Sequence, residues 1–185
     1  MEDLNKHIAA TLKELRQKKG LSLDKVALAT GVSKAMLGQI ERGESSPTVA
    51  TLWKIAVGFD APFSLFIAEN NNLAHGLAQG GEHVQSVHLN ELRMQVVPLF
   101  PFDEQLKFEL FVIELSPHYE HLSLPHQQGV VEHVVVVAGS MEVLIAGIWH
   151  RLSSGEGISF AADQPHGYRN PSAITARFHN IIHYC

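Results

Sequence analysis

The spacing of apolar residues changes once along this chain of 185 residues, and the change limits what the chain can fold into. In residues 1–67, apolar side chains recur at every third or fourth position, as Ile8, Leu12 and Leu15 do, which is typical of amphipathic helices. In residues 94–185 they alternate with polar ones in short runs separated by glycine and proline, which indicates strands. We therefore expect an all-α N-terminal part and an all-β C-terminal part.

Residues 68–93 separate these two parts and are predicted to form a flexible linker. They begin with an Asn triplet and several glycines and hold few apolar side chains. No apolar run approaches the ~18 residues of a membrane-spanning helix, and the acids near the N-terminus are unlike a signal peptide. The only cysteine is Cys185, so no internal disulfide is expected. A cytoplasmic protein without a membrane partner fits these features.

Two short helices joined by a tight turn are expected inside the N-terminal part. Ser22 and Ser33 can cap helices at their N-termini, and Gly31 suits the turn between them. After a first helix that ends at Gly20, the expected helices cover residues 23–30, 34–43, 49–59 and 61–68. Two helices joined in this way form the helix-turn-helix arrangement.

The run GLSLDKVALATGVSKAMLGQIERGESSPTVATLWKIA resembles the Xre or phage-repressor class of helix-turn-helix domains. Many fixed positions agree at once, among them Gly20-Leu21-Ser22, Gly31-Val32-Ser33, Ile40-Glu41, Gly43 and Pro47. The resemblance implies that the third helix reads DNA and that Arg16 and Glu41 form an ion pair between the first and third helices. It also implies contacts with base edges or phosphates by Ser22, Ser33, Lys34, Ala35, Met36, Gln39 and Ser45.

Gln39 can bind adenine through two hydrogen bonds, and Ala35 or Met36 can touch a thymine methyl group. Two positions depart from the class, because Leu23 stands where Gln is common and Gly38 where Ser is common. The net charge of −5 is divided unevenly, with nine Lys and Arg against seven Asp and Glu in the first 68 residues. The cationic part is therefore the one that would meet phosphates. The alternative is a helical interaction domain without DNA affinity.

The C-terminal part carries two stretches that resemble the motifs of cupins, which are small jelly-roll barrels. The stretch PHQQGVVEHVVVVAG keeps the spacing of the first motif, with Gln128 in place of the second histidine. The stretch GEGISFAADQPHGYRNP keeps part of the second motif. The residues that match are His126, Glu132, Gly139, Gly155, His166 and Asn170.

Alternation along residues 132–138 places Glu132 on the opposite face from His133. If Glu132 faces the barrel interior, His126 and His166 can converge with it on one ion. Two imidazoles and a carboxylate suit Zn, Fe, Ni or Mn, and Gln128 can supply a fourth, weak oxygen ligand. The alternative is that His126 and Glu132 bond each other and hold no metal.

A ligand-binding role is predicted for four further barrel residues. Tyr168 shares a strand face with His166, so it is expected to line the same cavity. Arg177, His179 and His183 share one face of the last strand. If that face is interior, these cationic groups would suit an anionic or zwitterionic ligand.

The whole chain resembles helix-turn-helix regulators with a C-terminal cupin sensor. The resemblance implies a homodimer that binds a pseudo-palindromic double-stranded DNA operator and responds to a small-molecule effector, such as an amino-acid-like metabolite or a polyamine. The rival class is an enzyme, a metal-dependent cupin dioxygenase or isomerase fused to a DNA-binding head. A purely structural partner protein is a third alternative, and it would lack salt-dependent DNA affinity.

Overall fold

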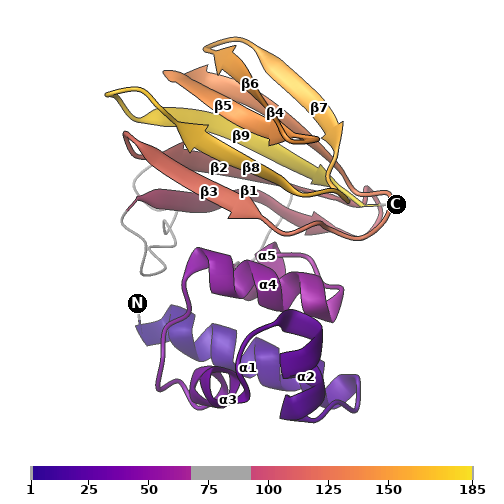
Figure 1. The fold of residues 1–185 in the computed structure, drawn as a ribbon. Helices are drawn as coiled ribbons and strands as arrows, with labels where there is room; N and C mark the ends of the chain where they lie inside the picture. Colours follow the sequence, from indigo (N-terminus) through magenta and orange to yellow (C-terminus); the bar gives the residue numbers. More distant parts are fainter. Residues whose placement is uncertain (1, 68–92, 185) are drawn as a thin grey trace. The chain divides into compact units, whose positions relative to one another are not determined.

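The computed structural model describes residues 2–67 and 93–184, which belong to two compact units (Figure 1). The helical unit contains α1 (Glu2–Lys18), α2 (Leu23–Thr30), α3 (Lys34–Glu41), α4 (Val49–Phe59) and α5 (Ser64–Ile67). The other unit contains β1 (Met94–Asp103), β2 (Phe108–Leu115), β3 (Tyr119–Ser123), β4 (Val131–Ala138), β5 (Ser140–Ile145), β6 (Ile148–Ser153), β7 (Gly157–Ala161), β8 (His166–Asn170) and β9 (Ala176–His183). The expected all-α and all-β parts are confirmed. Residues 68–92 of the predicted linker lie outside the described residues.

Three hydroxyl side chains begin the central helices of the helical unit. Ser22 Oγ accepts a hydrogen bond from the Lys25 amide, and Ser33 Oγ accepts one from the Met36 amide. Thr48 caps α4 in the same way. Because each cap satisfies an amide that has no partner inside its helix, the three starting points are well defined.

The core of the helical unit joins apolar residues from all five helices, and one ion pair lies at its edge. The largest fully buried side chains are Ile8, Leu12, Leu37, Ile40, Leu52, Ile55, Phe59, Phe63 and Phe66. Arg16 binds Glu41 through two hydrogen bonds, of 2.6 and 2.9 Å, which confirms the expected pair between α1 and α3. No helix of the described residues is long and apolar enough to cross a membrane.

The β unit consists of two antiparallel sheets that face each other (Figure 1). One sheet has the order β1-β2-β9-β4-β7, and the other has the order β3-β8-β5-β6. Burial alternates along the central strands β2, β4 and β9, so one face of the five-stranded sheet is the core face. Phe111, Val134 and Phe178 lie on that face and are fully buried.

Strand β3 is not among the strands that the sequence pattern predicts. It pairs with β8, so that His121 lies opposite Tyr168. Its inward residue is His121 and its exposed residue is Leu122, which reverses the usual order of polar and apolar positions. The alternation of apolar and polar residues that predicts other strands is therefore missing from the sequence of β3.

Two helical glycines should respond in opposite ways to an added methyl group. In Gly38→Ala the new Cβ would lie 3.1 Å from Arg42 Nη1, the end of a flexible side chain, so we expect stabilisation of about 0.5–1 kcal/mol from better helix propensity. In Gly58→Ala it would lie 2.6 Å from Thr30 Cγ2 and 2.9 Å from the Ala29 carbonyl oxygen, so we expect destabilisation of about 1–3 kcal/mol. Urea unfolding followed by circular dichroism measures both free energies, and equal effects would contradict this packing.

Candidate functional site

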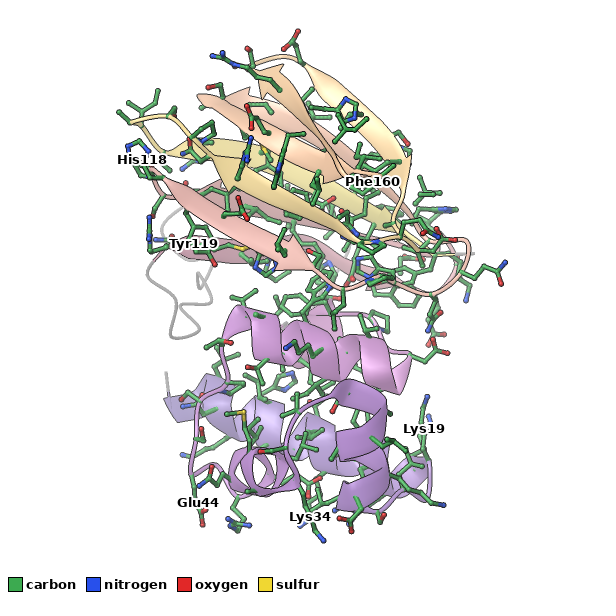
Figure 2. All side chains as sticks on the ribbon, viewed as in Figure 1. Lys19, Lys34, Glu44, His118, Tyr119 and Phe160 are labelled. Carbon is green, nitrogen blue, oxygen red and sulfur yellow. The ribbon has the colours of Figure 1, made fainter. Side chains whose placement is uncertain are left out.

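Helix α3 presents one exposed and one buried face. Leu37, Gly38 and Ile40 are buried against the unit, whereas Lys34 projects outward (Figure 2). The other exposed positions of the expected DNA-reading set are Ser22, Ser33, Ala35, Met36 and Gln39, while Ser45 is half-buried. A helix that enters a major groove needs such an exposed N-terminal half, so the geometry suits that role. The individual contacts with DNA stay predictions.

The hydroxyl groups of the two capping serines, Ser22 and Ser33, can still donate a hydrogen bond to a phosphate. The Oγ atoms of Ser22 and Ser33 accept backbone hydrogen bonds, but each hydroxyl proton remains available to donate to a phosphate oxygen. Lys34 Nζ lies 2.8 Å from Asp24 Oδ2 in an exposed ion pair. Binding of Lys34 to a phosphate would therefore compete with this weak surface pair.

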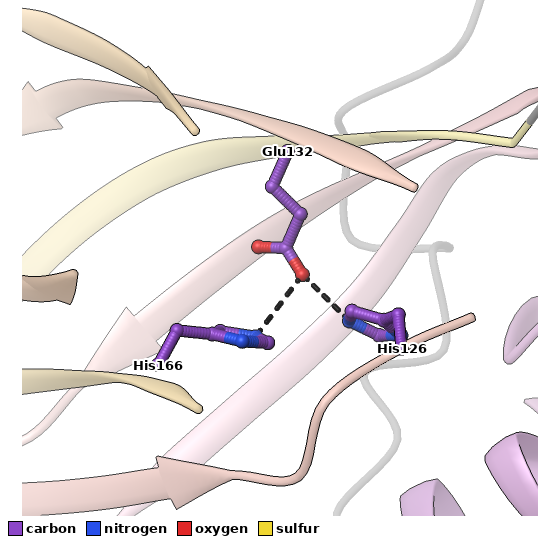
Figure 3. A group of neighbouring side chains, drawn as sticks. All are labelled: His126, Glu132 and His166. Carbon is purple, nitrogen blue, oxygen red and sulfur yellow. Dashed lines mark hydrogen bonds and ion pairs between the residues drawn. The ribbon is translucent and has the colours of Figure 1, made fainter. Parts of the chain in front are cut away.

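The barrel interior contains a cluster of three side chains with metal-ligand chemistry. Glu132 lies on the core face of β4 and is 0% exposed, as the alternation of that strand predicts. His126 Nε2 donates to Glu132 Oε1 over 2.7 Å, and His166 Nε2 lies 3.4 Å from the same oxygen (Figure 3). His126 precedes β4, while His166 begins β8. The structure thus brings together three of the four predicted ligands.

The charges in this cluster stabilise one another. Burial alone would raise the pKa of Glu132, but the neighbouring imidazoles of His126 and His166 hold that pKa well below its usual range. Burial lowers the pKa of His166, but the Glu132 carboxylate more than offsets this effect and the pKa is raised. The carboxylate is therefore ionised at neutral pH, which is the form that binds metal ions.

The donor set fits a divalent transition metal. His166 Nδ1 donates to the Gln164 carbonyl oxygen over 2.9 Å, which orients the ring so that Nε2 faces the cluster. Among the described residues, this buried Nε2 has no hydrogen-bond partner. One ligand atom from each of His126, Glu132 and His166 lies within 4.8 Å of the others. A buried nitrogen with a free lone pair beside a carboxylate and a second imidazole is what such an ion requires.

The second oxygen of Glu132 is held by one residue from β8 on the facing sheet and one from β9, the strand beside β4. Tyr168 Oη donates to Glu132 Oε2, and Asn180 Nδ2 donates to the same atom over 3.0 Å. Burial, reinforced by the charge of Glu132, raises the pKa of Tyr168 well above its usual value, so the hydroxyl remains a donor. Sequence reasoning missed Asn180, although it is the one polar side chain on the strand face that the buried Phe178 and Ile182 share.

The predictions for Arg177 and His179 depended on their strand face being interior, and that condition is not met. The core face of β9 carries Phe178 and Asn180, because its apolar residues fill the space between the sheets. Arg177 is exposed and binds Glu114 on β2. Gln128 is also exposed, so its predicted role as a fourth metal ligand finds no support in this geometry.

His121 is a further buried group, and the sequence analysis assigns it no role. It is 8% exposed and lies opposite Tyr168 on the neighbouring strand. Burial and the charge on His166 lower the pKa of His121 to about 4, while Glu132 acts in the opposite direction. His121 is therefore neutral at physiological pH.

The chain matches two known domain families. The helix-turn-helix family matches residues 12–66, and the cupin domain family matches residues 111–182. These are the two domain types that the fold and the motif residues indicate. Together they define a DNA-binding regulator with a cupin domain.

Two relatives match this chain over its whole length. The HTH-type transcriptional regulator SutR of Escherichia coli K12 is 48% identical over 184 residues, which cover 100% of this chain and 98% of that protein. An HTH_3 family transcriptional regulator from Vibrio cholerae has a crystal structure with 46% identity and a TM-score of 0.86, over 100% of this chain and 98% of that one. The chain therefore belongs to the family of HTH-type transcriptional regulators that carry a C-terminal cupin domain.

The cupin part also has a solved relative of its own. The cupin domain of an XRE family transcriptional regulator from Enterobacter cloacae is 49% identical, with a TM-score of 0.50, and covers 50% of this chain and 98% of that one. Because the relatives are named as regulators, the prediction of a regulator in place of an enzyme is confirmed.

The buried, neutral His121 should make stability depend on pH. Its folded pKa of about 4 lies below the unfolded value of ~6.5, so the unfolded chain binds a proton first as the pH falls. We expect the free energy of unfolding to fall between pH 6.5 and 4 by up to about 3 kcal/mol from this group.

Urea unfolding of wild type, His121→Leu and His133→Leu with a chelator present tests this expectation. The His121→Leu variant should lose this part of the pH dependence. The control should keep it, because His133 lies on the exposed face of β4. Parallel pH profiles for wild type and His121→Leu would contradict the assignment.

Proposed function

We propose that this regulator binds its operator as a cytoplasmic homodimer and senses a small molecule through a divalent metal in its cupin domain. His126, Glu132 and His166 would hold the metal. The observation that carries the proposal is the buried Nε2 of His166. This nitrogen has no hydrogen-bond partner among the described residues and lies 3.4 Å from the ionised carboxylate of Glu132. Such a nitrogen is costly to bury unless a ligand satisfies it.

The number of protein ligands suits a sensor. A Zn, Fe, Ni or Mn ion held by three side chains keeps coordination positions open for an external ligand. An amino-acid-like effector offers a carboxylate and an amine that can fill them. Tyr168, predicted to line this cavity, lies with its ring centroid 6.1 Å from that of His166. The effector would bind beside this ring.

Two copies of the helical part explain operator recognition better than one. A single α3 exposes few base-reading side chains, and the net positive charge of its part is small. A homodimer doubles both contributions and reads two half-sites ~34 Å apart. Effector binding would favour one arrangement of the two DNA-reading helices and change operator affinity by ~1–3 kcal/mol, or about 5–150-fold.

The Gln39→Ala substitution should relax base discrimination at one position of each half-site. Gln39 is exposed on α3, and loss of a two-bond contact with adenine costs about 1–3 kcal/mol. Binding to a library of operator variants, measured at one salt concentration, reports the preference. Gln17→Ala, an exposed glutamine on α1, is the matched control and should bind like wild type. An unchanged preference in Gln39→Ala would rule out base reading by this residue.

Removal of His166 should abolish the response to effector and leave DNA binding intact. Metal analysis by mass spectrometry on natively purified protein should find a stoichiometric metal in wild type and in His150→Ala, whose substituted residue is exposed on β6. His166→Ala should contain none, while its helical unit still binds operator DNA. Small molecules released from the wild type on denaturation would identify the effector. A wild type free of metal would contradict the proposed sensor.

A further inference from the structure

The two oxygens of the buried Glu132 carboxylate have different surroundings. Oε1 faces His126 Nε2 and His166 Nε2, at 2.7 and 3.4 Å. Oε2 accepts hydrogen bonds from Tyr168 Oη and Asn180 Nδ2. A carboxylate oxygen has two lone-pair sites in its plane, so two donors fill Oε2.

The two donors to Oε2 are rigidly placed. Tyr168 is 3% exposed and Asn180 is 2% exposed, and they come from neighbouring sheets, on β8 and β9. Asn180 Nδ2 also lies 3.3 Å from Tyr168 Oη, which links the two donors to each other. The Tyr168 ring packs against Phe178, with ring centroids 5.4 Å apart. Rotation of the carboxylate would break both hydrogen bonds inside a buried site, where an unmade hydrogen bond is costly.

We infer that Tyr168 and Asn180 are positioning residues that reserve Oε2 and make Glu132 bind a divalent metal through Oε1 alone. This inference rests on the proposed metal centre and states how many ligand atoms the protein supplies to it. Binding through one oxygen keeps the protein contribution at three ligand atoms, two nitrogens and one oxygen. The hydroxyl of Tyr168 is then committed to Glu132 and does not bind the effector.

Removal of the Tyr168 hydroxyl should change both affinity and coordination. In Tyr168→Phe one lone-pair site of Oε2 is left empty, so the carboxylate can turn and offer both oxygens. Loss of such an outer partner typically weakens metal binding 10–100-fold. We expect weaker Co²⁺ binding and less intense visible absorption bands, because those bands weaken as the coordination number rises. Asn180→Leu should shift both quantities in the same direction.

The barrel offers a matched control. Tyr184 Oη donates to Glu109, a second fully buried carboxylate on the core face of β2. Tyr184→Phe therefore removes the same kind of hydrogen bond without touching Glu132. Its Co²⁺ affinity and spectrum should match those of wild type.

The experiment is Co²⁺ titration of the full chain after removal of bound metal, with chelator competition for affinity, visible absorption for coordination and thermal unfolding to verify folding. Weaker binding with dimmer bands in Tyr168→Phe, beside a normal Tyr184→Phe, supports the inference. Wild-type affinity and spectrum in Tyr168→Phe would overturn it and leave the metal centre standing. Equal weakening in both tyrosine variants would also overturn it. Absence of Co²⁺ binding by wild type would overturn the metal centre itself and the inference with it.

Discussion

The buried charge of Glu132 organises the cluster of polar side chains that it shares with His126 and His166 inside the β unit. Glu132 is shielded from water, and burying an ionised carboxylate is costly unless it is paired and hydrogen-bonded. Four side chains surround it, namely His126, His166, Tyr168 and Asn180. They come from β8, β9 and the segment before β4. The carboxylate is therefore paired and hydrogen-bonded only when these elements are in the correct register.

The same arrangement connects stability with the proposed sensing. The imidazoles that keep Glu132 ionised are the groups that would bind a metal, and the Tyr168–Asn180 pair determines which oxygen faces them. An ion at this position would bind His166 Nε2, the one cluster nitrogen that has no hydrogen-bond partner within the described residues. Binding there would stabilise the folded β unit, and it would shift a conformational equilibrium to the extent that one conformation binds the ion or the effector more tightly.

The helical unit depends on a different principle. Serine caps and a left-handed Gly31 define the ends of α2 and α3, and the Arg16–Glu41 pair joins α1 to α3. The caps and the turn are local devices that the sequence predicts, whereas the Arg16–Glu41 pair joins distant residues and is expected only from the resemblance to the helix-turn-helix class. The buried face of α3 then holds the helix while its other face stays available to DNA.

What the sequence determines by itself is whatever follows from short-range periodicity and chemistry. That includes the bounds of α2 and α4 and the placement of Glu132 and His133 on opposite faces of their strand. Which of the two faces is inward, and so whether Glu132 meets His126 and His166, is decided by the packing of the two sheets. Strand β9 shows the limit of prediction from short-range sequence patterns. Both faces of β9 mix polar and apolar residues, so only its pairing with β2 and β4 decides that Asn180 points inward and Arg177 outward. The contacts of His121 and Tyr168 depend on strand pairing across more than 40 residues, and a register between distant segments is decided only when the whole core packs.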